Sequence, residues 1–269
     1  MDFKSKYPRE FVEQIEKFRL IDDDFMKACF KDNIPAVQLV LRIILGDDKL
    51  VVTEVRTQDE LKNIYGRSVC LDIHAIDGHG RHHDIEIQRS DKGACAQRAR
   101  FNSAIMDANI LRAGEDFEDL PDSCVIMITE NDVLKGNLPI YHIDRLVRET
   151  KTPFNDGASL IYVNSRYQDD SPLGKLMKDF YCADARDIYY PELAGRVEFL
   201  KNSEEGVSQM CEAMEKIKNS GKLEGKIENM VNLIKRGLIS VDTAVMADPD
   251  VTRDRLIRYA EAHGVVLQA

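Results

Sequence analysis

The alternation of apolar and polar residues predicts a β-hairpin at residues 69–88. Two alternating segments flank a tight turn that contains Gly78 and Gly80. Because successive side chains of a strand point to opposite faces, the apolar residues of both segments share one face. The members of this face are Leu71, Ile73, Ala75, Ile85 and Ile87. The opposite face carries acidic and amide side chains, namely Asp72, Asp84, Glu86 and Gln88.

Two of these acids are expected to face each other across the hairpin. A turn centred near His79 places Asp72 opposite Glu86. Directly opposed side chains of an antiparallel pair lie about 5 Å apart at Cβ. Two carboxylates at that distance repel each other unless one is protonated or a cation lies between them. The pair is therefore a candidate site for a hard divalent cation, which prefers oxygen ligands. The alternative is an ordinary solvated hairpin face.

The pattern up to residue 202 predicts an α/β fold with a mixed sheet flanked by helices. A hairpin, then a long helix, then a buried apolar strand implies a crossover connection between parallel strands. Residues 1–20 are expected to form a polar lead-in, and residues 56–67 a loop. The expected helices cover residues 25–30, 36–45, 94–111, 173–181 and 192–199. The other expected strands cover residues 50–55, 123–129, 138–143 and 158–164.

From about Ser203 onward the pattern predicts helices alone. They cover residues 204–217, 225–236, 240–246 and 250–262, with Gly221, Gly237 and Pro249 between them. We therefore expect two parts, a domain of residues 1–202 and a C-terminal helical region of residues 203–269. The helical region is a candidate surface for homo-oligomer formation.

Composition and charge narrow the class of protein. The chain has 269 residues, of which 43% are hydrophobic and 31% charged, as in ordinary globular proteins. No segment has the apolar length of a membrane span, and the N-terminus lacks an apolar signal core, so we expect a cytoplasmic protein. The net charge of −10 argues weakly against a nucleic-acid partner. Residues 56–112, however, carry nine Lys/Arg against eight Asp/Glu, so the sequence is still compatible with a positively charged face near the hairpin.

The hairpin acids also form a recognisable motif. Asp72 followed by Glu86-Ile87-Gln88 is the pattern D…(D/E)-x-K with Gln in the last place, and a predicted helix follows at once. This layout resembles the PD-(D/E)XK nuclease fold. The wider stretch from Arg56-Thr-Gln to Gln97-Arg-Ala-Arg100 is similar to the recombination-promoting nuclease (Rpn) group, also called PD-(D/E)XK nuclease family transposases. The resemblance covers about residues 20–165 and implies a restriction-endonuclease-like core.

The resemblance implies roles for individual residues. Asp72, Glu86 and the backbone carbonyl of Ile87 would bind Mg²⁺, with Mn²⁺ as the alternative ion. Gln88 would be catalytic, although most relatives of the wider fold have a lysine there. Four basic residues would hold the phosphates of DNA, and they are Lys62, Arg67, Arg98 and Arg100. The helix dipole gives Arg98 and Arg100 no help near a helix start, so a partner explains their position better than helix stability does. An ordinary exposed helix face is the alternative for these two residues.

Three functions are consistent with the sequence. The first is a Mg²⁺-dependent DNA endonuclease that serves recombination, mobile elements or defence. The second is a nuclease-fold protein with weak or no cleavage that binds DNA or regulates, and the missing motif lysine at Gln88 favours it. The third is a protein-interaction module built on the C-terminal helices.

Overall fold

A computed structural model describes residues 3–63, 66–265 and 267. The chain divides into two compact units, Met1–Met210 and Cys211–Ala269, and the division falls inside one long helix. The predicted assignment of a nuclease-like domain to residues 1–202 and a helical region to residues 203–269 stays a prediction. Among the described residues, no helix combines the length and apolar character needed to cross a membrane.

The first unit is built on a six-stranded mixed sheet with strand order β1-β2-β3-β4-β8-β5. Pairs β3/β4 and β4/β8 are parallel, whereas β1/β2, β2/β3 and β8/β5 are antiparallel. The strands are β1 (Val52–Leu61), β2 (Val69–Asp77), β3 (His82–Gln88), β4 (Ser123–Thr129), β5 (Ile140–Ile143) and β8 (Ala158–Asn164). A separate two-stranded sheet contains β6 (Leu146–Val147) and β7 (Thr152–Pro153). The predicted mixed α/β fold is confirmed.

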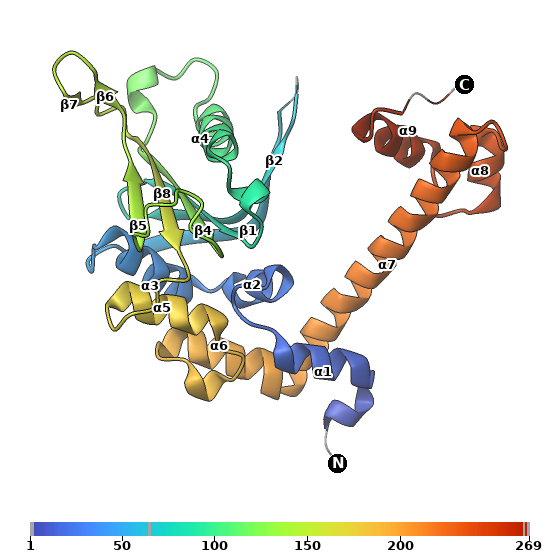
Figure 1. The fold of residues 1–269 in the computed structure, drawn as a ribbon, viewed down its shortest axis with the longest axis horizontal. Helices are drawn as coiled ribbons and strands as arrows, with labels where there is room; N and C mark the ends of the chain where they lie inside the picture. Colours follow the sequence, from blue (N-terminus) through green and yellow to red (C-terminus); the bar gives the residue numbers. More distant parts are fainter. Residues whose placement is uncertain (1–2, 64–65, 266, 268–269) are drawn as a thin grey trace. The chain divides into compact units, whose positions relative to one another are not determined.

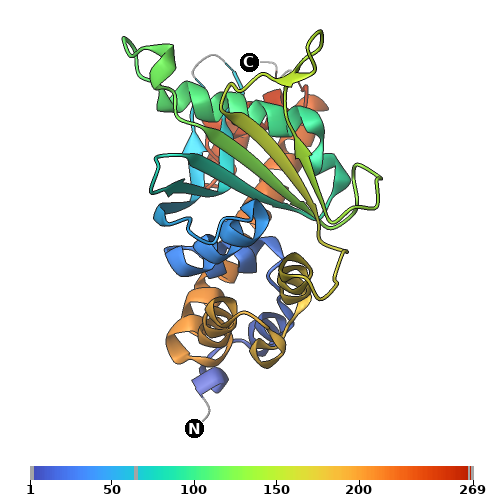
Figure 2. The ribbon, with the colours of Figure 1, turned by 90° about the vertical axis from the view of Figure 1, so that its left-hand side faces the viewer.

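Helices cover both faces of the sheet in the first unit (Figures 1 and 2). Helix α4 (Ala96–Ile110) lies on one face and forms the crossover between β3 and β4. The other side holds α2 (Asp23–Phe30), α3 (Ile34–Leu45), α5 (Pro172–Tyr181) and α6 (Pro191–Asn202). Under α4, a buried cluster combines helix residues Ala99 and Met106 with strand residues Leu71, Val125, Met127 and Tyr162. This packing fixes α4 against β2, β4 and β8.

Local sequence signals explain where several helices begin and end. Asn33 caps α3 by accepting a hydrogen bond from the Ala36 N–H at 3.3 Å, and Pro35 occupies the first turn, where no donor is needed. Gly46 ends α3 in the left-handed conformation with φ of 65°. Ser171 caps α5 in the same way, through the Gly174 N–H at 3.1 Å.

Two predictions for polar segments of the first unit were wrong. Residues 1–20 contain a 3-10 helix, η1 (Phe3–Lys6), and α1 (Arg9–Lys17), which buries Phe11 and Ile15 one turn apart. Residues 56–61, expected in a loop, continue β1 to Leu61, opposite Val69 of β2. Both segments are mostly polar, so their local pattern resembles a loop. Pairing at the sheet edge and packing of one helix face decide their structure instead.

The second unit has its own small apolar core. It draws residues from the end of α7 (Glu204–Lys235), from α8 (Val241–Ala247) and from α9 (Arg253–Ala262). The buried members are Ile227, Val231, Ile234, Val241, Ala244, Val251, Leu256 and Ala260. The predicted break at Gly221 was wrong, since α7 runs through it without interruption. A glycine inside a helix costs only about 1 kcal/mol, which does not end a long helix. Shorter 3-10 helices elsewhere are η2 (Asp91–Ala94), η3 (Phe117–Asp119) and η4 (Ala185–Asp187).

A buried lysine ties the helices of the first unit together. Lys201 of α6 is 4% exposed, and its Nζ donates to the carbonyls of Glu16, Phe18 and Ala183 at 3.0, 2.5 and 2.5 Å. Burial lowers the pKa of Lys201 to about 8. We expect Lys201→Met to reduce the free energy of unfolding by about 2 kcal/mol, because three buried carbonyls lose their donor. Urea denaturation measures this, and an unchanged midpoint would contradict it.

Candidate active site

The predicted acid pair lies where the ladder between β2 and β3 ends. The last paired residues are Ile73 and Ile85, and beyond them side chains replace the backbone ladder. The Asp72 N–H donates to Glu86 Oε1 at 3.2 Å. In return, the Asp72 carboxylate accepts a hydrogen bond from the Ile87 N–H. The structure therefore brings the predicted residues Asp72, Glu86 and Ile87 together.

Helix α4 supplies partners for the acids of β3. Arg98 Nη2 lies 2.7 Å from Glu86 Oε2, and Asn102 Nδ2 donates to Asp84 Oδ2 at 3.1 Å. Four helical residues rise about 6 Å, which matches the roughly 6.6 Å between alternate residues of a strand. Two α4 residues that are four positions apart can therefore contact two acids that are two positions apart on β3. Arg98, predicted to hold a DNA phosphate, thus pairs with a carboxylate of the same site.

Gln88 belongs to the same cluster. Its Nε2 donates to Glu86 Oε2 at 3.1 Å, and its Oε1 lies 3.5 Å from Arg98 Nη1. A Cβ atom on Gly93 would lie only 2.1 Å from Gln88 Oε1, so a glycine at this position leaves room for the amide. Gln88 and Arg98 together hold one oxygen of Glu86.

Burial and mutual repulsion raise the pKa values of these acids. Glu86 and Asp84 are 0% exposed and Asp72 is 8% exposed. Desolvation is the largest cause and raises the pKa of all three acids. The negative charge of Asp72 further raises the pKa of Glu86, and the negative charge of Glu86 further raises the pKa of Asp84. For Asp72 the next cause is the charge of Asp23. The nearby positive charges of Arg98 and Lys27 therefore do not offset the burial of these three carboxylates and the negative charges around them.

The donor set fits a hard divalent cation. Among the described residues, no group of three or more His, Cys, Asp or Glu side chains is arranged to hold a metal ion. Mg²⁺ does not need such a group, because it keeps several waters and takes one or two carboxylates. Asp72 and Glu86 supply two carboxylates, and the backbone N–H of Asp72 donates a hydrogen bond to the carboxylate of Glu86. A cation between them would relieve the repulsion that raises their pKa values.

The four predicted phosphate-binding residues differ in their surroundings. Arg98 contacts Glu86 and Gln88, as described above. Lys62 and Arg67 lie in the connection between β1 and β2, and Arg100 lies on α4, and all three are exposed. Their contact with phosphates stays a prediction.

Two side chains near Asp72 were not singled out from the sequence. Lys27 of α2 is paired with Asp23 at 2.6 Å, and its charge lowers the pKa of Asp72 against the larger effect of burial. Gln58 of β1 donates from Nε2 to Asp72 Oδ1 at 3.3 Å. Neither contact has a local signature, because each joins segments that only the tertiary fold brings together.

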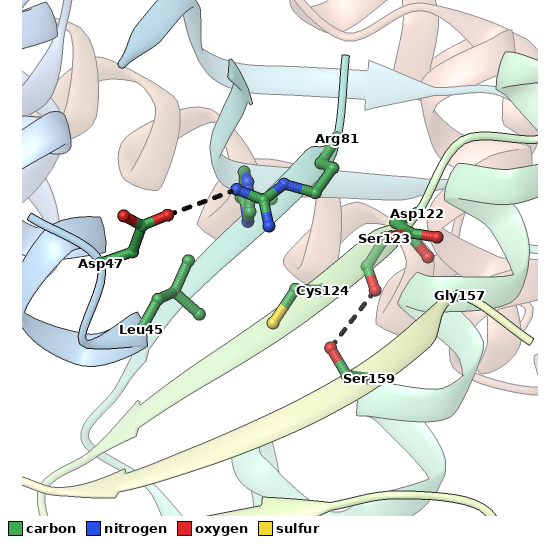
Figure 3. A pocket seen from close by; sticks show the side chains of 9 residues that line it. Leu45, Asp47, Arg81, Asp122, Ser123, Cys124, Gly157 and Ser159 are labelled. Carbon is green, nitrogen blue, oxygen red and sulfur yellow. Dashed lines mark hydrogen bonds and ion pairs between the residues drawn. The ribbon is translucent and has the colours of Figure 1, made fainter. Parts of the chain in front are cut away.

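A separate hollow lies at the other end of the strands (Figure 3). It has a volume of about 310 Å³, and its lining includes Arg81, His83, Cys124 and Ser159. Arg81 points toward Asp47 across this hollow, with an Nη2–Oδ2 distance of 3.8 Å. Asp72 and Glu86 are not in the lining, because His83 and Cys124 stand near the starts of β3 and β4. The acid pair therefore does not belong to this hollow.

Burial of Asp84 predicts a pH-dependent effect of its replacement. The pKa of Asp84 is raised in the folded protein, so protonated Asp84 favours the folded state. This stabilisation is complete below the unfolded pKa of about 4 and is lost as the pH rises through the folded pKa. The substitution Asp84→Asn keeps an acceptor for Asn102 and removes the titrating group. Asp84→Asn should therefore gain stability over the wild type as the pH rises from about 5 to about 8, by up to about 1.4 kcal/mol per pH unit.

Urea denaturation of metal-free protein across this range measures that gain. Burial lowers the pKa of His82 to about 4, which affects stability in the opposite sense. This effect is common to both proteins and cancels in their difference. A difference that stays constant with pH would contradict the assignment of Asp84 as a buried acid with a raised pKa.

Comparison with known protein families identifies a family to which the chain is similar. The family model described as PD-(D/E)XK nuclease family transposase matches residues 32–170. The matched segment contains Asp72, Glu86, Gln88 and Arg98, and it confirms the resemblance seen in the sequence. Comparison with curated proteins gave no significant match, and neither did comparison with solved structures.

Proposed function

Because this chain belongs to the PD-(D/E)XK nuclease family transposases, we propose that it is a Mg²⁺-dependent DNA endonuclease. Nucleases of this fold family generally use divalent metals. One observation carries the proposal for this chain. Asp72 and Glu86 are buried side by side where β2 and β3 separate, and their pKa values are raised by burial and by nearby negative charge. Such a pair is suited to a divalent cation.

The residues that would hold the ion are Asp72, Glu86 and the backbone carbonyl of Ile87. When bound, a divalent cation supplies Lewis-acid activation of the phosphodiester and of the attacking water. The protein would contribute the fixed positions of the two carboxylates, since each accepts a hydrogen bond from the other strand. Held carboxylates need no reorganisation when substrate arrives.

Arg98 would take over the charge that a motif lysine supplies in most relatives of the wider fold. Gln88 can orient a water or a phosphate oxygen, but it carries no charge. The guanidinium of Arg98 reaches both Gln88 and Glu86 from α4, so a positive charge stands beside the motif. A cation at this place would stabilise the negative charge that develops on the phosphate during attack.

DNA is the substrate we propose, with contacts to its phosphates from Lys62, Arg67 and Arg100. These exposed residues come from the β1–β2 connection and from α4. Phosphate contacts fix the position of a duplex but do not read its sequence. Recombination, mobile elements or defence are the settings in which such an activity would serve, and the C-terminal helices are a candidate surface for self-association.

One observation favours a second function, a DNA-binding or regulatory protein with little cleavage. Arg98 already pairs with Glu86 at 2.7 Å, and an arginine in that place competes with a metal ion for the carboxylate. In this case Lys62, Arg67 and Arg100 would bind DNA, and the acids would serve to hold Arg98.

Plasmid cleavage separates the two functions. We expect the wild-type protein to nick supercoiled DNA with Mg²⁺ or Mn²⁺ and to lose this activity with EDTA. DNA binding measured in parallel, by a mobility shift in Ca²⁺, distinguishes them. Binding without cleavage in any of these ions would favour the regulatory function, and cleavage that persists in EDTA would contradict the metal-dependent one.

A further inference from the structure

Gln58 has an unusual backbone conformation for a residue inside a strand. Its φ is 56°, in the left-handed region that L-residues other than glycine rarely adopt. The other described non-glycine residues with positive φ all lie in turns or loops, and they are Asp32, Lys135, Asn137, Lys151 and Asn155. Gln58 instead lies within β1 (Val52–Leu61).

A change of register does not explain this conformation. Thr57 pairs with Ile73 and Asp59 pairs with Leu71, so the β1–β2 register is the same on both sides of Gln58. Residues in sparsely populated backbone regions concentrate at functional sites, where the surrounding structure holds them. The contacts of the Gln58 side chain are therefore the place to look for its role.

The Gln58 amide joins two residues of β2 beside the acid pair. Nε2 donates to Asp72 Oδ1 at 3.3 Å, and Cys70 Sγ donates to Oε1 at 3.7 Å. A thiol donor at Oε1 is consistent with the amide orientation in which the NH₂ group faces Asp72. The carboxylate of Asp72 thus receives one hydrogen bond from β1, through Gln58, and one from β3, through the Ile87 N–H.

We propose that Gln58 is a positioning residue that orients Asp72 for a divalent cation, an inference that rests on the function proposed above. A neutral amide suits this task, because it holds a carboxylate without neutralising the charge that attracts a metal ion. A lysine or arginine in its place would compete with that ion. Partners of this kind, which orient a metal ligand from outside, typically contribute 10–100-fold to metal affinity or activity.

The left-handed conformation makes the proposal separable from a purely structural role. Glycine adopts φ of 56° freely, so Gln58→Gly removes the amide while it also relieves the backbone. Lys151→Gly is the matched control, since Lys151 is exposed, has φ of 57° and lies in the turn between β6 and β7. Both variants should shift the Tm by less than about 3 °C.

The test compares Mn²⁺ affinity and plasmid cleavage in the full-length variants. Gln58→Gly should bind Mn²⁺ at least about tenfold more weakly, with its cleavage rate at low Mn²⁺ reduced in proportion and partly recovered at high Mn²⁺. Gln58→Asn, which keeps a shorter amide and tolerates this conformation, should lie between it and the wild type. Lys151→Gly should match the wild type in both measurements.

Two results would overturn the proposal in different ways. If the wild type binds Mn²⁺ and cleaves DNA and Gln58→Gly does both equally well, Gln58 does not position Asp72, while the proposed function stands. If the wild type neither binds Mn²⁺ nor cleaves DNA, the proposed function fails, and the role of Gln58 fails with it.

Discussion

Asp72→Asn and Glu86→Gln should each reduce metal-dependent DNA cleavage by at least about 10³-fold. Each change removes the negative charge of one proposed ligand and keeps the shape of the side chain. The amide oxygen in the Glu86→Gln variant can still accept the hydrogen bond from the Asp72 N–H, which Glu86 accepts at 3.2 Å. Loss of a positioned charge that acts on the transition state typically costs 10²–10³-fold, and loss of a metal ligand adds the loss of the ion itself.

Stability measured on the same variants excludes unfolding as the cause. Burial and nearby negative charge make both acids harder to ionise, so removing one charge should leave the metal-free protein as stable as the wild type or more stable at pH 8. Glu60→Gln, an exposed acid of the neighbouring strand β1, is the matched control and should keep full activity. Cleavage within about threefold of the wild type in Asp72→Asn would remove this residue from the active site.

Arg98→Gln should lower the cleavage rate by about 10²-fold, and Gln88→Lys in the same chain should restore part of it. Arg98 reaches both Glu86 and Gln88, so its loss removes the positive charge from the motif. A lysine at position 88 would return a positive charge from the place where most relatives of the wider fold carry it. The readout is the single-turnover cleavage rate at saturating Mg²⁺.

The double variant separates catalysis from substrate binding. A partner that acts only by binding DNA would raise the KM and leave the rate at saturating DNA unchanged. Arg112→Gln, an exposed arginine just beyond the end of α4, is the control for a general loss of positive charge. Failure of Gln88→Lys to raise the rate of Arg98→Gln, together with an effect on KM alone, would contradict the catalytic role of Arg98.

The register of the hairpin could be predicted because a short-range rule, the tight turn, fixes it, and the pair Ile73/Ile85 places Asp72 next to Glu86. The predicted faces were wrong at Leu71, which packs under α4 on the side where Arg98 meets Glu86, so strict strand alternation ends at residues 71–72. The apolar run 123–129 predicted β4 with the bounds that the structure has, Ser123–Thr129. The long helix between β3 and β4 required their parallel arrangement, which is present.

The residues around this centre depend on tertiary packing and escaped prediction. The partner of Arg98 follows from the height at which α4 rests on β3, which no local pattern encodes. Lys27 acts on Asp72 because α2 packs beside the sheet, far away in sequence. The left-handed conformation of Gln58 has no sequence signal, because glutamine, unlike glycine or asparagine, is not typical of that region.

The same distinction explains the errors in the fold. Residues 56–60 read as a loop because they are polar, but they form part of the outer strand β1 of the sheet, where polar residues are tolerated. Gly221 read as a helix end, but α7 continues because no capping structure or turn competes with it there. Element ends defined by caps, such as Gly46 after α3, were predicted correctly.

The position of a bound Mn²⁺ ion tests the account most directly. Anomalous diffraction from crystals of the wild-type protein soaked in Mn²⁺ locates the ion without reference to activity. We predict one strong peak within direct coordination distance, about 2.2 Å, of a carboxylate oxygen of Asp72 and one of Glu86, and its loss in Asp72→Asn. Strong Mn²⁺ peaks elsewhere with none between these carboxylates, while Arg98 stays paired with Glu86, would contradict the proposed metal site.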